Sequence, residues 1–274
     1  MVTNETPTDI TPGVHSSSAE PIKPTLLAFH GSGSNATVHT VQLARLNRLI
    51  KKDFHIESIQ APFPSPAGPG VLPFFDGCGP FFRWLPHATE SLSHETMRNG
   101  SSTHLLPPQV EALVRAAVTR IRAAGSYVIG LVGFSQGTKV VAGLLRAAEM
   151  CREYGLRGED VDWCDFAFGV SVCSSYPPGL VPGSVLDRVP ALEREKAWER
   201  KISSPAFLVQ GSRDEWNWAG KGLVGRHYEV GEGKGVLVEW DMGHHYPVQA
   251  EESERIAEWM KEVLKTVEAK RDVR

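Results

Sequence analysis

Short apolar runs alternate along the chain with longer segments in which apolar residues recur every three or four positions. The apolar runs have the length of strands and lie at 25–29, 55–60, 126–132, 166–172, 206–210 and 236–240. Segments of helical period lie between or after them, at 38–52, 107–124, 137–154 and 249–267. This alternation predicts an α/β fold, in which a mostly parallel central sheet of about six strands carries helices on both faces.

Two long stretches, 62–106 and 174–204, break the alternation. Both follow the carboxyl ends of predicted strands, which is the edge where parallel sheets place their sites. Loops of this length inside a compact domain are usually lids or binding loops. We therefore expect one domain over 24–268, with these two insertions as lid loops that wall a substrate pocket. A polar, disordered lead-in at 1–23 and a short tail at 269–274 complete the predicted organisation.

The composition excludes several classes of protein. The 274 residues are 41% hydrophobic, which is enough for one core, and the net charge of -3 is spread along the chain. Without a basic block or a run of about 18 apolar residues, neither nucleic acid nor a membrane is an expected partner. The four cysteines are scattered, and the N-terminus lacks the apolar region of a signal peptide. We expect free thiols in a reducing, cytoplasmic compartment.

The strongest chemical signal is the sequence Gly133-Phe-Ser-Gln-Gly137, which matches G-x-S-x-G. It lies between a predicted buried strand and a predicted helix, which is the context that a nucleophilic serine on a sharp turn requires. The helix that follows directs its N–H groups toward developing negative charge. Ser135 is therefore the predicted nucleophile. The alternative is a serine that only caps the helix.

A nucleophilic serine needs a base, and the base needs an orienting carboxylate. The strand at 206–210 leads into Asp214, and the strand at 236–240 leads into His244, so both follow later strands in the expected order. Glu215 is the alternative acid, and His245 is the alternative base. We favour Asp214 because it stands in the turn itself, and His244 because it directly follows a glycine.

Acyl transfer also needs two N–H donors for the tetrahedral oxyanion. The backbone amides of Gln136, after the nucleophile, and of Ser32, in the loop after the first strand, are the predicted donors. Aromatic residues in the first insertion and near the acid are candidates for substrate binding, with the hydrophobic core as the alternative placement. They are Phe75, Phe81, Phe82, Trp84 and Trp216.

These motifs together resemble the fungal family of serine hydrolases, which are small α/β-hydrolases related to carboxylesterases and acyl-protein thioesterases. The matching segments span most of the chain and are Leu27-Ala-Phe-His-Gly31, Phe74-Phe-Asp-Gly77, Phe81-Phe-Arg-Trp84, Gly133-Phe-Ser-Gln-Gly137, Gly211-Ser-Arg-Asp214 and Gly243-His-His-Tyr-Pro247. The resemblance implies Ser135 as nucleophile, Asp214 as acid and His244 as base. The aromatic Asp-Gly stretch is similar to that of members encoded beside fungal polyketide synthases, which implies an acyl substrate held as a thioester on a carrier protein.

The leading hypothesis is hydrolysis of an acyl ester or thioester through an acyl-enzyme, without a cofactor or a metal. An acyltransferase would use the same triad with an alcohol or amine in place of water, and a small-molecule carboxylesterase would differ only in its substrate. A non-catalytic binding protein on the same fold is the remaining alternative. If an acidic carrier domain docks, Arg115, Arg120 and Arg122 on one predicted helix are a candidate surface.

Overall fold

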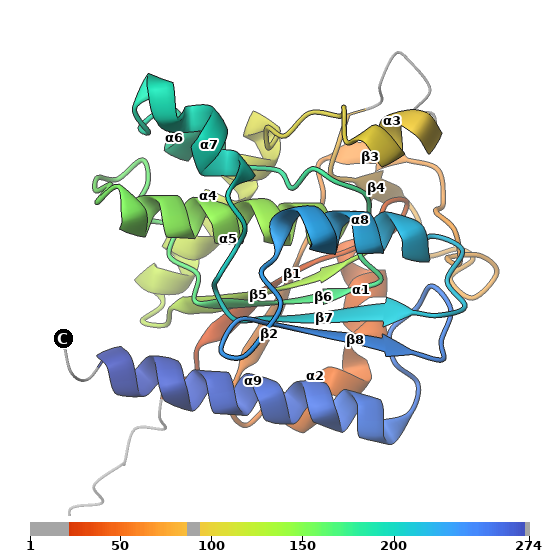
Figure 1. Ribbon diagram of the computed structural model, residues 1–274. Helices are drawn as coiled ribbons and strands as arrows, with labels where there is room; N and C mark the ends of the chain where they lie inside the picture. The colour runs from red at the N-terminus through yellow and green to blue at the C-terminus, as the bar shows by residue number, and fades with distance from the viewer. Residues whose placement is uncertain (1–21, 87–93, 272–274) are drawn as a thin grey trace, which may run out of the picture.

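The computed structural model describes residues 22–86 and 94–271 of the chain. A six-stranded sheet with the order β2-β1-β5-β6-β7-β8 crosses the molecule, and all its strands run parallel (Figure 1). The strands are β1 (Thr25–Phe29), β2 (His55–Ile59), β5 (Val128–Phe134), β6 (Phe168–Val172), β7 (Ala206–Gly211) and β8 (Gly235–Trp240). The predicted fold class, including the number of strands, is confirmed.

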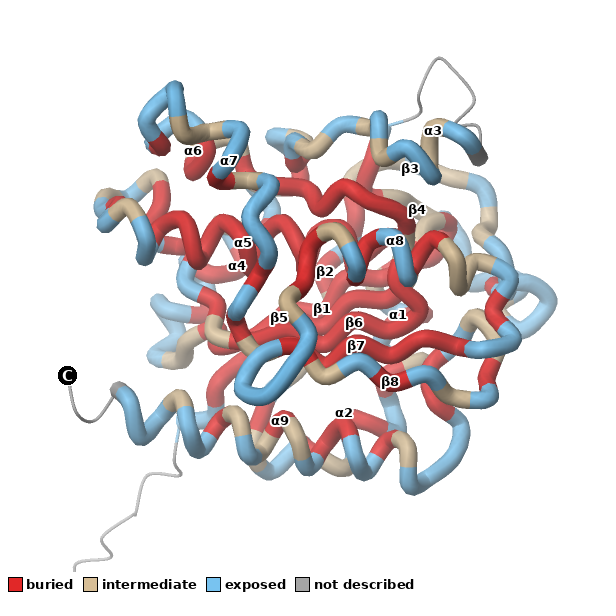
Figure 2. The backbone as a smooth tube through the Cα atoms, viewed as in Figure 1, coloured by how far each residue is buried: buried red, intermediate tan, exposed pale blue. Residues whose placement is uncertain are grey.

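The central strands are apolar on both sides because helices cover both faces of the sheet. Every residue of β1, β5, β6 and β7 is buried, while β2 and β8 at the two edges are partly exposed. In Figure 2 the central strands are red, which marks buried residues, whereas the outer helices combine buried, intermediate and exposed residues. Continuous burial explains why these strands read as unbroken apolar runs instead of alternating ones.

Two layers of helices sandwich the sheet (Figure 1). One face carries α4 (Pro108–Ala123), α5 (Gly137–Glu153) and α8 (Asn217–His227), and the other carries α2 (Ala44–Ile50) and α9 (Ala250–Arg271). The shorter elements are α1 (Ala36–Gln42), α3 (His94–Asn99), α6 (Gly183–Leu186), the 3₁₀ turn η1 (Ala191–Glu193) and α7 (Arg194–Glu199). Among the described residues, no helix is long and apolar enough to cross a membrane.

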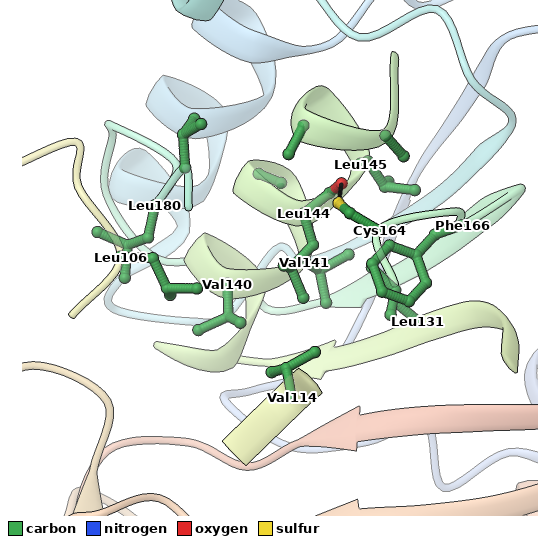
Figure 3. Close-up of a cluster of buried hydrophobic side chains, with 14 of the residues drawn as sticks. Leu106, Val114, Leu131, Val140, Val141, Leu144, Leu145, Cys164, Phe166 and Leu180 are labelled. Carbon is green, nitrogen blue, oxygen red and sulfur yellow. Dashed lines mark hydrogen bonds between the residues drawn. The ribbon is translucent and has the colours of Figure 1, made fainter. Parts of the chain in front are cut away.

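Helix α5 lies at the centre of the larger core cluster. Val140, Val141, Leu144 and Leu145 lie on it between the sheet and the covering segments, as Figure 3 shows. The Cys164 thiol donates a hydrogen bond to the Leu144 carbonyl (3.7 Å). Because α5 begins directly after the G-x-S-x-G turn, its close packing fixes the direction in which that turn faces.

The two insertions contain more regular structure than their composition predicts. The first forms a hairpin of β3 (Phe63–Ser65) and β4 (Phe81–Arg83) and the helix α3, with 87–93 outside the described residues. The second forms α6, η1 and α7, of which α6 and α7 pack against α5. The isolated bridge between Leu105 and Val181 joins the two insertions.

The helix boundaries differ from prediction in two places. The segment predicted as one helix over 38–52 is divided at Leu43 into α1 and α2. The last helix continues to Arg271, so part of the predicted tail at 269–274 is helical, because the residues 268–271 are good helix formers. Nearly all of the predicted lead-in, at 1–21, and the tail residues 272–274 lie outside the described residues.

Candidate active site

Ser135 stands at the turn between β5 and α5, in the conformation that the nucleophile prediction requires. Its φ of 48° lies in the left-handed region, which is strained for a residue with a side chain. Hydrogen bonds hold this conformation: the Ser135 amide donates to the Val172 carbonyl (3.1 Å), and the Thr138 hydroxyl donates to the Ser135 carbonyl (2.6 Å). The neighbouring strand and the first turn of α5 therefore fix the serine.

The glycines of the motif are required by close approach of the backbone. A Cβ at Gly137 would lie 2.1 Å from the carbonyl oxygen of Phe29, and one at Gly133 would lie 2.8 Å from Val141 Cγ2. Because both contacts are too short for a real Cβ, α5 can begin this close to the end of β1 only with glycine at 137. This proximity places the loop after β1 beside the serine.

Asp214 and His244 come together at the carboxyl ends of neighbouring strands β7 and β8. The Nδ1 of His244 donates to Asp214 Oδ2 at 2.7 Å, and the carboxylate is 1% exposed against 16% for the imidazole. The other carboxylate oxygen of Asp214 accepts from the Trp216 amide (2.8 Å). Burial by itself raises the pKa of this carboxyl, but its bonds to His244 and Trp216 outweigh burial and lower the pKa. The acid is thus held as a carboxylate.

The two alternative residues lack this geometry. Glu215 lines the same cavity but makes no hydrogen bond to His244 among the described residues. The ring of His245 bonds to the backbone of neighbouring residues, with Nδ1 donating to the Tyr246 carbonyl (2.8 Å) and Nε2 accepting from the Gly243 amide (3.3 Å). The structure therefore pairs Asp214 with His244. Because Asp214 occupies Nδ1, Nε2 is the nitrogen of His244 that is left for a reacting group.

The residues of both predicted oxyanion donors lie at the cavity. Ser32 and Gln136 line the same cavity as Ser135 and His244. Within 22–86 and 94–271, neither of their amides donates to a protein oxygen. The side chain of Gln136 instead accepts from the Trp84 amide (2.8 Å), which ties the turn to the first insertion. Both amides are available for an oxyanion, and this role remains a prediction.

Hydrogen bonds of the buried residues His30 and Trp84 hold the loop after β1 in place. His30 is buried, with Nδ1 donating to the Gly31 carbonyl (2.7 Å) and Nε2 accepting from the Ala61 amide (3.1 Å). Burial lowers the pKa of His30 to about 4. The Trp84 indole donates to the His30 carbonyl (2.7 Å). A neutral histidine and a buried tryptophan thus support the turn that carries Ser32.

The cavity above these residues has a volume of about 990 Å³, which is large for a small-molecule pocket. Of the predicted substrate-binding residues, Phe75 and Trp216 line it, whereas Phe81, Phe82 and Trp84 do not. Trp84 is 0% exposed and bridges two loops, and Phe82 packs against the core. The second insertion contributes only its first residues, at 174–176, so most of it is not a wall of the cavity as predicted.

One residue beside the site was counted in the sequence only as a free thiol. Cys173 follows β6 with a φ of 48°, is fully buried, and donates from Sγ to the carbonyls of Gly243 and His245 (3.6 Å each). Its sulfur, an Asp214 oxygen and a His244 nitrogen all lie within 4.8 Å of one another. Burial raises the pKa of the thiol, so Cys173 is protonated and donates to these carbonyls. Its position after a strand, on the same edge as the triad, was the available signal.

A serine on a strained strand-to-helix turn, with an aspartate–histidine pair after later parallel strands, defines an α/β-hydrolase that uses a serine nucleophile. Residues 19–256 match the family described as "Serine hydrolase (FSH1)", and the chain belongs to this family. The family resemblance seen in the motifs is thereby confirmed.

Two relatives agree with this assignment, and one solved structure shares the fold. The chain is 31% identical over 225 residues to the dihydromonacolin L-[lovastatin nonaketide synthase] thioesterase of Aspergillus terreus, covering 81% of this chain and 85% of the relative. It is 30% identical over 248 residues to esterase citA of Monascus ruber, covering 88% and 92%. The crystal structure of acyl-protein thioesterase 2 from Zea mays shares the fold with a TM-score of 0.50 at 17% identity, covering 89% of this chain and 94% of that one.

Proposed function

We propose that this serine hydrolase cleaves a large acyl thioester or ester of the polyketide type, with Ser135 as nucleophile, His244 as general base and Asp214 as the orienting acid. The observation that carries the proposal is the Asp214–His244 hydrogen bond in the cavity that Ser135 also lines. The thioesterase and esterase names of the relatives support the substrate class.

The proposed reaction uses the three side chains in turn. His244 Nε2 takes the proton of Ser135 as Oγ attacks the carbonyl carbon, and the amides of Ser32 and Gln136 stabilise the oxyanion, each by ~3 kcal/mol. The intermediate collapses, the bond to the leaving sulfur or oxygen breaks, and His244 returns the proton to it. Water then attacks the acyl-enzyme with the same base, which releases the acid and restores Ser135.

The shape and lining of the cavity favour a long acyl chain. Apolar side chains from the first insertion, from α1 and from the start of α8 line the cavity; they include Val41, Val71, Phe75, Met97, Trp216 and Ala219. We propose that the chain arrives on the phosphopantetheine arm of a polyketide synthase carrier domain. The four cysteines are free thiols, which accords with a reducing, cytoplasmic setting for such a reaction.

The test is to measure kcat/KM on matched acyl thioesters and oxoesters of several chain lengths. We expect long thioesters to be preferred, Ser135→Ala to abolish turnover, and His245→Gln to retain far more activity than His244→Gln. A preference for short oxoesters would instead identify a small-molecule carboxylesterase. Acyl transfer to added alcohols faster than hydrolysis would identify a transferase. Wild-type activity in Ser135→Ala would refute the assignment of the nucleophile, and a wild type inactive on every ester would indicate a binding protein.

A further inference from the structure

The exposed face of helix α2 is basic, and it begins at the edge of the active-site cavity. No acidic residue occurs between positions 30 and 52. Arg45 and Arg48 lie one turn apart on α2, and Lys52 lies in the turn that follows the helix. All three are exposed. We call these three residues the α2 basic face.

The positive charges of this face have no ion-pair partner within the described part of the molecule. Over residues 22–86 and 94–271, none of the three cations forms an ion pair or a side-chain hydrogen bond. Helix α9 packs beside α2, but the ion pair found there joins Lys261 to Asp53 (3.7 Å) and leaves the α2 basic face unpaired. An exposed set of unpaired like charges favours an acidic partner.

The rival basic surface on α4 has different properties. Arg120 pairs with Glu57, while Arg115 and Arg122 donate to the backbone carbonyls of Glu159 (3.3 Å) and Asp162 (3.0 Å). None of these three arginines lines the cavity. The helix candidate that the sequence offered for carrier docking is therefore engaged in contacts within the molecule and separate from the site.

The α2 basic face, in contrast, is continuous with an apolar rim. Arg45 lines the cavity together with Val41, Phe74 and Val248, which are 57%, 84% and 58% exposed. Exposed apolar side chains bordered by charges are typical of surfaces that dock another protein. Their position at the cavity means that a docked partner would stand where a tethered substrate can enter.

We propose that the α2 basic face and this apolar rim dock an acidic acyl carrier domain, whose thioester arm enters the cavity past Arg45. This inference rests on the proposed thioesterase function. Carrier domains are acidic in most systems, which matches the sign of the face. The arm carries a phosphate, and an arginine at the cavity edge can hold a phosphate through charge-assisted hydrogen bonds. Arg48 and Lys52 lie outside the cavity lining and would contact only the carrier domain.

The test compares one acyl group on two leaving groups. An octanoyl chain is presented on a fungal polyketide synthase carrier domain and on N-acetylcysteamine, and kcat/KM is measured for both. The variant is Arg48→Glu with Lys52→Glu, and the control is Arg115→Glu with Arg122→Glu, which makes the same change in net charge on α4. We expect the α2 variant to lose about tenfold on the carrier substrate alone, and the wild-type carrier rate to fall with added salt.

Each other outcome counts against the inference. An unchanged carrier rate in the α2 variant would refute docking at this face, and an equal loss in the α4 control would show a general effect of net charge. Parallel loss on N-acetylcysteamine would indicate damage to the enzyme instead of to docking. If the wild type hydrolyses neither thioester, the proposed function itself fails. If it hydrolyses the small thioester but gains nothing from the carrier, only the docking inference fails.

Discussion

Replacing Gly137 by alanine tests whether the close approach of α5 to β1 sets the geometry of catalysis. The new Cβ would lie 2.1 Å from the carbonyl oxygen and 2.6 Å from the carbonyl carbon of Phe29, and 2.9 Å from the carbonyl oxygen of His30. All three are main-chain atoms, so no side chain can rotate to relieve the overlap. The end of β1 and the loop that carries Ser32 must therefore move away from Ser135 by ~1 Å or more.

Displacement of this size has separable effects on stability and on rate. Overpacking of a core contact costs about 1–3 kcal/mol, partly offset by about 1 kcal/mol from the better helix propensity of alanine. A misplacement of ~1 Å between reacting groups costs ~100-fold in rate. We therefore expect Gly137→Ala to remain folded, with a lowered free energy of unfolding, and to lose about two orders of magnitude in kcat/KM, mostly in kcat.

The assay pairs hydrolysis of a thioester with denaturant unfolding of the same preparation. Gly225→Ala is the matched control, because Gly225 also lies in a helix but a Cβ added there would meet no atom of another element within 4 Å. We expect this control to keep wild-type activity and to gain up to about 1 kcal/mol in stability. Wild-type kcat/KM in Gly137→Ala would refute the argument that this contact positions the oxyanion loop.

Three further predictions concern residues around the site. Trp84→Phe leaves the His30 carbonyl unpaired, so we expect about 1–2 kcal/mol lower stability in urea unfolding and a fall in kcat larger than any change in KM. Asp214→Asn should lower kcat by ~10⁴-fold while Glu215→Gln does not, and equal losses in steady-state assays would contradict the assignment of the acid. Burial lowers the pKa of His227 from 6.5 to about 3. The unfolded chain therefore takes up a proton on this histidine at a higher pH than the folded protein does. The free energy of unfolding should fall as pH drops from about 6.5 toward 3, by up to ~1.4 kcal/mol per pH unit. His227→Asn should flatten that slope in unfolding titrations.

The sheet and the pairing of acid and base were predictable because strong local signals agree with the global fold. The six strands read as apolar runs since both faces of the sheet are covered, and the parallel arrangement then places the ends of β5, β7 and β8 on one edge. The hydrogen bond between Asp214 and His244 follows from that arrangement and from chain order. No comparable signal exists for the insertions.

The aromatic residues of the first insertion show why the rest could not be predicted. Phe75 and Trp84 lie in the same Pro- and Gly-rich stretch, yet Phe75 lines the cavity and Trp84 is buried beneath it. An aromatic side chain is equally suited to a core and to an acyl-binding wall, so only tertiary contacts decide between them. Cys173 was missed for a related reason, because its one signal, a position after a predicted strand, is shared by cysteines that adjoin no site.

The strand order has a consequence for how activity is lost. Ser135 follows the interior strand β5, which has a neighbour on each side, whereas His244 follows β8, which pairs only with β7 in the described sheet. Edge elements open locally at lower free energy than a buried centre does, as hydrogen exchange reveals in other proteins. Mild heating should therefore detach the base while the nucleophile is still in place. The enzyme would then lose its activity reversibly at temperatures where its core remains folded.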